Sequence, residues 1–397
     1  MRISVKINQP PKREGSILVM AAVVMAIVMA FAAFTVDLGM ITVTKGQLQN
    51  AADSAAHATA KELLRAFGPS ATLTPAEAET AARARAVEMV GRFRSGDVQS
   101  TIAVDTRDVR FGNRSWDEAN QEWLMQWGVQ PYNMVEVTAR RTAATNSALP
   151  MTFARFLGIS SHDVAASSIA SVAPINGFEK PKPNETVDIL PIAVDLQTWE
   201  SLMVAAAGNS SGGTSSTFKD VYRYANSTGG ILSGSDGVLE FDIYPDVNTS
   251  LPPGNRGTVD LGSPNNSTAD LKRQIVNGLN EYDMSYFPNG ELMCSFEHPV
   301  QLNGDPGISA GIEASLKSII GQVRAIPIFT QVSGPGNNAN YTVVKFVGVR
   351  IMAVNLKGGP KSRYLMVQPA EFSSPYVIRS NGDIQFDSIV SQPYLIR

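Results

Sequence analysis

The pattern with the most specific chemical meaning in this sequence is "GISAG", Gly307 to Gly311. G-x-S-x-G marks the nucleophilic serine of α/β-hydrolases, which follows a strand directly and works with an acid and a histidine that come later in the chain. Residues 304–306 are expected to separate Ser309 from any strand. The three histidines all precede Ser309: His57, His162 and His298. We therefore expect Ser309 to begin an ordinary helix and the chain to be no enzyme.

Patterns for metals and cofactors are also missing from the sequence. Three scattered histidines and the single Cys294 give no H-E-x-x-H, no paired CxxC and no EF-hand loop. "DMSYF" from Asp283 lacks the second serine of D-x-S-x-S metal sites, and "GPGNNA" from Gly334 lacks the third glycine of a dinucleotide fingerprint. We expect no cofactor, no metal and no small-molecule substrate. Cys294 is expected to be buried, with an intermolecular disulfide as the alternative.

An apolar run near the N-terminus determines on which side of a membrane the rest of the chain is expected to lie. Ile17 to Val36 carry no charge, and a helix of this length spans about 30 Å, the thickness of the hydrocarbon core of a bilayer. A basic bias precedes the run and predicts a cytoplasmic N-terminus, with everything after Asp37 outside the cytoplasm. The formal net charge of the chain is −3, which does not indicate nucleic-acid binding. The charges before the run are Arg2, Lys6, Lys12 and Arg13 against Glu14.

The apolar run leads into an alanine-rich segment with helical spacing, which we expect to end at Gly68–Pro69. Small side chains three and four residues apart form a ridge that lets another backbone approach closely. We expect this ridge to contact helices of other subunits. A good helix former on a lightly packed face is the alternative. The ridge consists of Ala51, Ala52, Ala55, Ala56 and Ala60.

Residues 13–60 resemble the N-terminal module of the TadE/TadG-like Flp pilus-assembly proteins. That module combines an Arg-x-Gly entry, an apolar span, "VDLG" and a helix of the "LQNAAD" type. Ser54 and His57 replace the alanines that are usual in that helix. Later regions are similar to the same family through less specific motifs. The matching residues are Gly15, Asp37, Gly39, Leu48, Gln49, Asn50, Ala51, Ala52 and Asp53.

The resemblance implies a non-catalytic, single-pass protein of the bacterial inner membrane. It implies a minor pilin or an assembly component of a Flp/Tad-type pilus. The expected partners are the membrane and other Tad/Flp pilus or envelope proteins, reached through helix packing. The alternative is a tethered or secreted extracytoplasmic domain that binds a ligand or partner outside any pilus.

The sequence leaves three fates of the apolar run open. A signal peptidase would cut after the small-x-small sequence that ends at Ala32. Prepilin-type cleavage would follow Gly15, although pilins of this kind carry Glu at the fifth position after the cut, where this chain has Met20. The run continues through Val36 into helical sequence, which favours the third fate, a retained anchor.

The complete pattern predicts an α+β protein. A capping box, Thr74 to Glu77, opens a helix, and strands are expected at 98–104, 109–113 and 133–142. A short amphipathic helix with Phe153, Phe156 and Leu157 is expected to end at Gly158.

We expect a pilin-like helix on a small antiparallel sheet, and then a second, strand-rich α+β domain with interspersed helices. The expected divisions are a basic cytoplasmic segment (1–15), a transmembrane helix (16–37), a pilin-like region (38–173), a linker (174–186) and an extracytoplasmic C-terminal domain (187–397).

Overall fold

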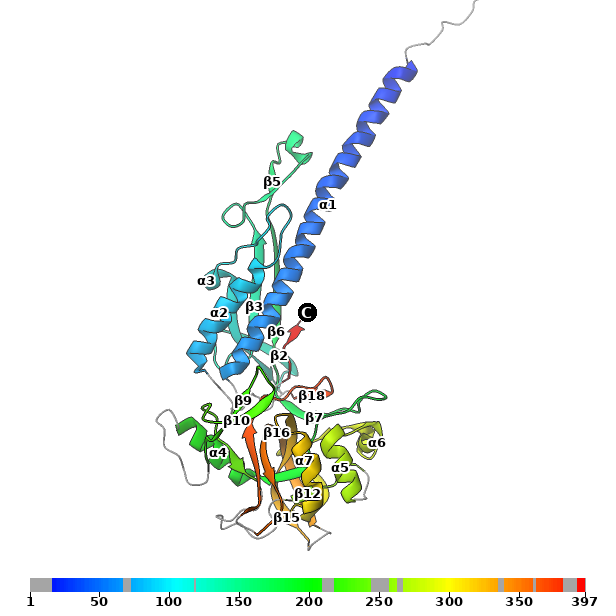
Figure 1. Cartoon of the computed structure of the whole chain (residues 1–397). Helices are drawn as coiled ribbons and strands as arrows, with labels where there is room; N and C mark the ends of the chain where they lie inside the picture. Colours follow the sequence, from blue (N-terminus) through cyan, green and yellow to red (C-terminus); the bar gives the residue numbers. More distant parts are fainter. Residues whose placement is uncertain are drawn as a thin grey trace, which may run out of the picture. The chain divides into compact units, whose positions relative to one another are not determined.

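The computed structural model describes residues 16–66, 73–117, 119–208, 218–243, 257–262, 267–334, 339–359, 362–380 and 391–396. Helices and strands are both abundant, so the expected α+β class is confirmed (Figure 1). The predicted cytoplasmic segment 1–15, with the possible processing residue Gly15, lies outside the described residues. The expected helix end at Gly68–Pro69 also lies outside them.

Contacts divide the chain into two compact units. The first unit comprises Met1–Ala55, Ala86–Val109 and Val137–Ser168. The second unit comprises Ala56–Arg85, Arg110–Glu136 and Ile169–Arg397. The predicted linker at 174–186 contains a strand, β7 (Ile175–Phe178). The domain boundaries given above stay a prediction.

The first element is one long helix, α1 (Ser16–Leu63), which a 3₁₀ turn, η1 (Leu64–Ala66), continues. The segment contains no proline, and its many alanine, leucine and methionine residues favour a helix. The hydroxyl of Thr35 donates to the carbonyl of Phe31 at 2.8 Å, so this polar group is satisfied within the helix. The predicted continuation of the apolar run into the alanine-rich helix is confirmed.

The predicted capping box begins the second helix, α2 (Pro75–Gly91). Glu77 accepts hydrogen bonds from the backbone N–H and the hydroxyl of Thr74, both at 2.8 Å. The N–H of Glu77 donates to the hydroxyl of Thr74 at 3.3 Å. Pro75 occupies the first helical position, where a backbone N–H would have no helical acceptor. Its lack of an N–H therefore costs no hydrogen bond.

A five-stranded sheet has the order β19-β6-β3-β1-β2. The pairs β1–β2 and β19–β6 are antiparallel. The expected alternation in β3 is confirmed, because Val135, Val137 and Ala139 are buried. The strands are β1 (Val109–Asp117), β2 (Glu122–Trp127), β3 (Met134–Arg141), β6 (Val164–Ser171) and β19 (Tyr394–Ile396).

Three features of this region differ from the sequence prediction. Strands β2 and β19 were not expected. The strand expected at 98–104 is wrong, because Thr101 donates its N–H (2.9 Å) and its hydroxyl (2.8 Å) to the carbonyl of Phe93. These bonds hold the segment as a loop after α2, and a short helix, α3 (Asp105–Asp108), follows it.

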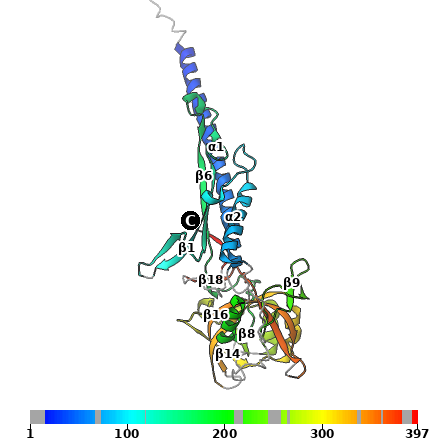
Figure 2. The ribbon, with the colours of Figure 1, turned by 90° about the vertical axis from the view of Figure 1, so that its left-hand side faces the viewer.

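A narrow hairpin in the first unit carries a short helical tip. β4 (Leu149–Pro150) pairs with β5 (Ser161–His162), and the 3₁₀ helix η2 (Ala154–Leu157) lies between them. Gly158 ends η2 at a φ of 86°, which a glycine adopts without strain. The expected short helix and its stop are therefore confirmed. Figures 1 and 2 both show this tip beside α1, with further turns of α1 extending past it.

The largest sheet has seven strands in the order β11-β17-β16-β14-β12-β8-β15. β16 pairs with β15 as well, which closes β15, β8, β12, β14 and β16 into a ring. The apolar residues 341–356 lie almost wholly in β16, so this stretch is a strand of the sheet and not a second span. The strands are β8 (Ile192–Asp195), β11 (Phe241–Asp242), β12 (Gly257–Val259), β14 (Val300–Pro306), β15 (Val323–Ser333), β16 (Ala339–Asn355) and β17 (Tyr364–Pro369).

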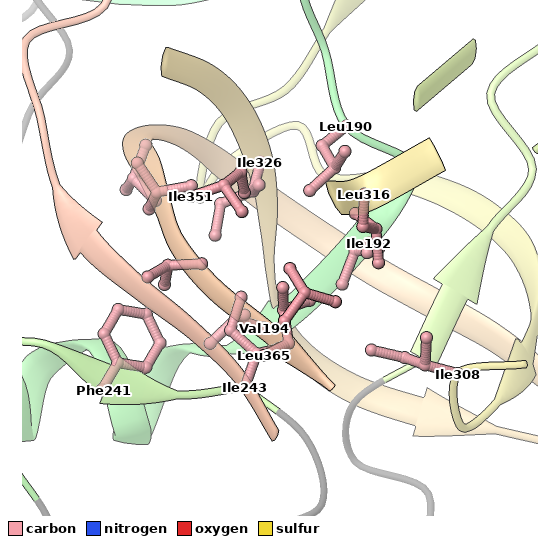
Figure 3. Packing of buried hydrophobic residues seen from close by; sticks show 14 of the residues in the cluster. Leu190, Ile192, Val194, Phe241, Ile243, Ile308, Leu316, Ile326, Ile351 and Leu365 are labelled. Carbon is pink, nitrogen blue, oxygen red and sulfur yellow. The ribbon is translucent and has the colours of Figure 1, made fainter. Parts of the chain in front are cut away.

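Helices and strands of the second unit share one large apolar core. Leu316 of α7 (Glu313–Ser318) belongs to the same buried cluster as Ile192 and Ile326 (Figure 3). Trp199 of α4 (Leu196–Gly208) is also a member of this cluster. α5 (Thr268–Asn277) adds Leu271 and Ile275, which the helical spacing of the sequence predicts. A second cluster contains Phe178, Phe346 and Tyr341.

The remaining elements of the described chain are short. They are β9 (Tyr222–Ala225), β10 (Gly230–Ser233), α6 (Glu281–Met284), η3 (Pro288–Gly290), β13 (Leu292–Met293), η4 (Ala310–Ile312) and β18 (Val377–Arg379). β7, β13 and β18 form a three-stranded sheet, and β9 and β10 form a hairpin.

Candidate membrane-anchoring site

The N-terminal half of α1 is apolar and uncovered. Its large side chains are exposed along the whole predicted span, from Ile17 (80%) through Phe31 (70%) to Val36 (49%). Among the described residues, α1 is the one helix long and apolar enough to cross a membrane. Water does not stabilise such a surface, so it fits the hydrocarbon of a bilayer or the apolar helices of other subunits. The possible processing residue Ala32 lies inside this continuous helix.

Asp37 follows the span directly and joins α1 to the hairpin tip. Asp37 is only 4% exposed. Its carboxylate accepts hydrogen bonds from the backbone N–H groups of Thr152 (2.8 Å), Phe153 (2.9 Å) and Ala154 (2.5 Å). These three N–H groups belong to the first residue of η2, Ala154, and to the two residues before it, where no helical carbonyl is available to them. Asp37 therefore caps η2 from another part of the chain.

A second junction lies further along α1. The side-chain carbonyl of Gln47 accepts a hydrogen bond from the N–H of Gly96 at 2.6 Å. Gly96 has a φ of 63°, and a Cβ there would come within 2.7 Å of Arg141 and 3.1 Å of Thr44. Glycine is the residue that allows this approach to α1.

Arg141 holds the turn at Gly96 from inside the protein. The residue is fully buried, and its Nη1 donates to the carbonyl of Ser95 at 2.8 Å and to the carboxylate of Asp97. This hydrogen bond lowers the pKa of Asp97. Motif reasoning did not single out Gln47, Gly96 or Arg141. The period-two pattern of β3 contains one signal, because it places Arg141 on the same buried face as Ala139.

The residues that carry the family resemblance have unequal roles in this structure. The amide of Gln49 donates to the carboxylate of Asp53 (2.8 Å) and to the carbonyl of Ser167 (3.3 Å), so it links α1 to β6 within the first unit. Asn50 is exposed. A Cβ at Gly39 would meet nothing within 4 Å, so contacts within the described chain do not require a glycine there.

The alanine ridge is an internal packing surface. All five of its residues are 0% exposed: Ala51, Ala52, Ala55, Ala56 and Ala60. The expectation that this ridge contacts helices of other subunits does not fit this structure, because the chain itself covers the ridge. The small side chains do allow close approach, but the approaching groups belong to the same molecule.

The residues considered for catalysis occupy ordinary positions. Ser309 caps η4, and its hydroxyl accepts a hydrogen bond from the N–H of Gly311 at 3.2 Å, so the expected helix start is confirmed. The expectation that residues 304–306 separate Ser309 from a strand is wrong, since β14 runs to Pro306 through ladder bonds with β12. The His57 and His298 side chains are exposed.

Cys294 lies in the second apolar cluster at 3% exposure, as expected, and burial raises the pKa of its thiol. Among the described residues no three His, Cys, Asp or Glu side chains form a metal-binding group. An open, polar groove of about 560 Å³ lies between the segments around Glu185 and Glu281, and its lining includes Lys180 and Tyr282. Its side chains show no nucleophile–base arrangement of the kind that covalent catalysis requires.

Comparison with known proteins supports the N-terminal resemblance. Residues 15–62, nearly the whole of α1, match the family model described as putative Flp pilus-assembly TadE/G-like. The predicted family resemblance at residues 13–60 is thereby confirmed. No curated protein and no solved structure matches the chain.

Proposed function

We propose that this chain is a non-catalytic, single-pass protein of the bacterial inner membrane that acts as a minor pilin or an assembly component of a Flp/Tad-type pilus. The pilus-related role rests on the family match, and the matched segment coincides with α1. The basic residues before Ile17 favour a cytoplasmic N-terminus, with the remaining chain outside the cytoplasm.

The division of α1 into two surfaces is the observation that most supports this function. From Ile17 to Val36 the helix exposes apolar side chains, whereas from Leu48 onward it is buried by the chain. A helix that only stabilised a globular domain would not need the exposed half. A tether would need that half, but not its continuation as one rigid helix into the folded region. Together the two halves form a stem that joins an exposed apolar surface to the folded part of the first unit.

The buried ridge changes where subunit contact is expected. Since Ala52 and Ala56 are covered, we place helix packing with other subunits on the exposed half of α1. Its side chains are large and include Met20, Phe31 and Phe34. Contact between such helices in a membrane depends on close packing and shape, which an unrelated apolar helix would not reproduce.

A span exchange in the native host tests this proposal. Residues 17–36 are replaced by an unrelated twenty-residue apolar helix, and everything from Asp37 onward is kept. We expect the variant to be found in the membrane at wild-type level and to fail to restore pilus assembly to a deletion strain. The wild-type gene on the same plasmid is the control.

Two results would contradict the proposal. If the exchanged span restores pili fully, the span is only a tether and packs with no specific subunit. If the deletion strain makes pili normally, the chain is no pilus component. The second result would favour the alternative, a tethered domain that binds a ligand or envelope partner.

A further inference from the structure

The tip of the β4–β5 hairpin exposes large apolar side chains. Phe156 is 85% exposed and Leu157 is 82% exposed, and Ile159 (53%) and Phe153 (38%) lie beside them in the sequence. Single exposed apolar residues are common on proteins, but here four lie within seven residues at the end of one hairpin.

The hydrogen bonds of Asp37 fix the tip beside the end of the span. The three N–H groups that Asp37 binds belong to Thr152, Phe153 and Ala154, and Asp37 comes directly after the last residue of the span. Ala33, one helical turn earlier, is partly covered, whereas Ala32 and Phe34 are exposed. Because Asp37 holds these N–H groups directly after the span, the tip begins level with the last turn of the span.

The chemistry of the tip suits the boundary between lipid headgroups and acyl chains. Aromatic and aliphatic side chains bury their apolar surface about 5–10 Å into this boundary, and basic side chains contact anionic headgroups. The tip supplies the apolar groups from Phe156 and Leu157 and a positive charge from the exposed Arg155. Asp37 holds the start of the tip at the end of the exposed apolar surface of α1, so the same bilayer would reach both.

We propose that the η2 tip, Phe153 to Ile159, is a second membrane contact, inserted into the interface of the leaflet through which α1 leaves the bilayer. The inference rests on the proposed membrane anchoring by Ile17–Val36. Two attachment points fix the rotation of α1 about its own axis and the orientation of the first unit against the membrane. A single helix leaves both free.

Depth-dependent quenching in lipid nanodiscs tests this proposal on the full chain. The buried Cys294 is replaced by Ala, and a single cysteine at Phe156 (F156C) carries an environment-sensitive fluorophore. Lipids with a doxyl group near the headgroup quench a fluorophore at the interface, lipids with a doxyl group deep in the acyl chain quench one in the hydrocarbon core, as at position 24, and iodide quenches one in water. Val24→Cys in the span is the positive control, since Val24 is 51% exposed.

Ile102→Cys is the matched negative control. Ile102 is a 62% exposed apolar residue of the same unit. The preceding residue, Thr101, donates its hydroxyl to that of Ser95 at 3.1 Å. Ser95 is next to Gly96, whose N–H donates to Gln47 of α1. Gln47 lies ten residues beyond Asp37, which is about 15 Å further along α1.

We expect doxyl quenching at position 156 to be at least about threefold that at position 102, with iodide quenching in the opposite order. Equal quenching at 156 and 102, with strong quenching at 24, would overturn the tip contact and leave the anchor intact. Weak doxyl quenching at 24 would instead overturn the proposed anchor. Protection of 156 from iodide without doxyl quenching, which grows with protein-to-lipid ratio, would assign the tip to a second copy and also overturn the proposal.

A label-free measurement guards against an effect of the fluorophore. In the double variant Phe156→Ser and Leu157→Ser, both replaced side chains are more than four-fifths exposed, so the fold should be kept. We expect hydrogen exchange of the tip amides in nanodiscs to be faster in this variant than in the wild type, and equal in the two proteins in detergent. Equal rates in nanodiscs would contradict insertion of the tip.

Discussion

Asp37 shows how one buried carboxylate can hold a hairpin tip against a helix from a distant part of the chain. Burial of a charge is costly unless hydrogen bonds replace its water shell. Three backbone N–H groups do so here, and they are the groups that the start of η2 leaves without partners. The aspartate of the "VDLG" motif therefore has a structural reason in this chain, whereas the glycine of the same motif has none among the described contacts.

Replacement of Asp37 by alanine should release the hairpin tip from α1. Loss of this charged acceptor leaves three backbone N–H groups without their partner, so we expect the free energy of unfolding to fall. Hydrogen exchange at Phe153 and Ala154 should accelerate in parallel. Asp37→Asn is the matched control, since its amide oxygen still accepts, and it should lose less. Unchanged exchange at both amides in the alanine variant would contradict this role of Asp37.

Glu240 is a second buried carboxylate and lies in the second unit. Its hydrogen bonds do not offset the cost of burying its charge. It is fully buried and accepts hydrogen bonds from the backbone N–H groups of Val221 (2.8 Å) and Tyr222 (3.0 Å). Burial raises the pKa of Glu240 to about 7, because it outweighs these bonds, and the charges of Asp220 and Asp236 add to the rise.

This raised pKa predicts a loss of stability as the pH rises. Between the ordinary value of 4.5 and about 7, folded Glu240 keeps a proton that the unfolded chain releases. The free energy of unfolding should therefore fall as pH rises through this window, by at most ~1.4 kcal/mol per pH unit from this group, and the loss is complete above it. Thermal unfolding of the wild type and of Glu240→Gln from pH 5 to pH 8 should show a steeper decline in the wild type. Parallel curves would exclude this contribution of Glu240.

At the scale of elements, α1 presents two different surfaces in one continuous helix. Its first half exposes apolar side chains, and its second half is packed so tightly that the ridge alanines have no exposed surface. Native interiors have little free volume, so a larger side chain on the ridge must displace its neighbours.

Substitutions on the ridge should therefore destabilise the fold before they affect assembly. We expect Ala52→Leu and Ala56→Leu each to lower the free energy of unfolding by about 1–3 kcal/mol. His57→Leu, at an exposed position of the same helix, should change it by less than about 0.5 kcal/mol. Chemical unfolding in detergent measures all three. If the ridge variants unfold like the wild type and only co-assembly is lost, the ridge contacts another subunit and not its own chain.

The sequence predicted the elements that local interactions determine. The capping box at Thr74 and Glu77 and the alternation in β3 depend on residues a few positions apart, and both are present. The tertiary partners of Asp37 lie more than a hundred residues away, and no local pattern identifies them. No local pattern identifies β19 either, because its partner strand β6 lies far from it in the sequence. Tyr394 of β19 also accepts a hydrogen bond from the distant Arg114 at 2.8 Å.

The candidate site was only partly predictable for the same reason. The span Ile17–Val36 follows from composition alone, since charge-free length is a local property. The ridge was correctly placed on a helix, but helical spacing does not show which molecule covers it. The fold brings together α1, the loop that follows α2, and β3. The junction of Gln47, Gly96 and Arg141 depends on this tertiary arrangement, which no local sequence pattern identifies.

At the scale of the whole molecule, the function depends on whether the mature protein keeps its span. A retained α1 holds both the exposed apolar surface and the Asp37 junction in one helix. Cleavage at Ala32 would remove most of the exposed surface and leave a protein without an anchor in the described chain. Processing before Ser16 would keep the span and favour a filament subunit.

The intact mass of the mature protein, purified from its native envelope, shows whether the span is kept. We expect a membrane-fraction protein whose mass includes residues 17–36. A mass that starts at Ser16 would meet this condition and make a pilus subunit the leading function. A soluble protein whose mass starts at Ala33 would contradict both the anchor and the pilus proposal.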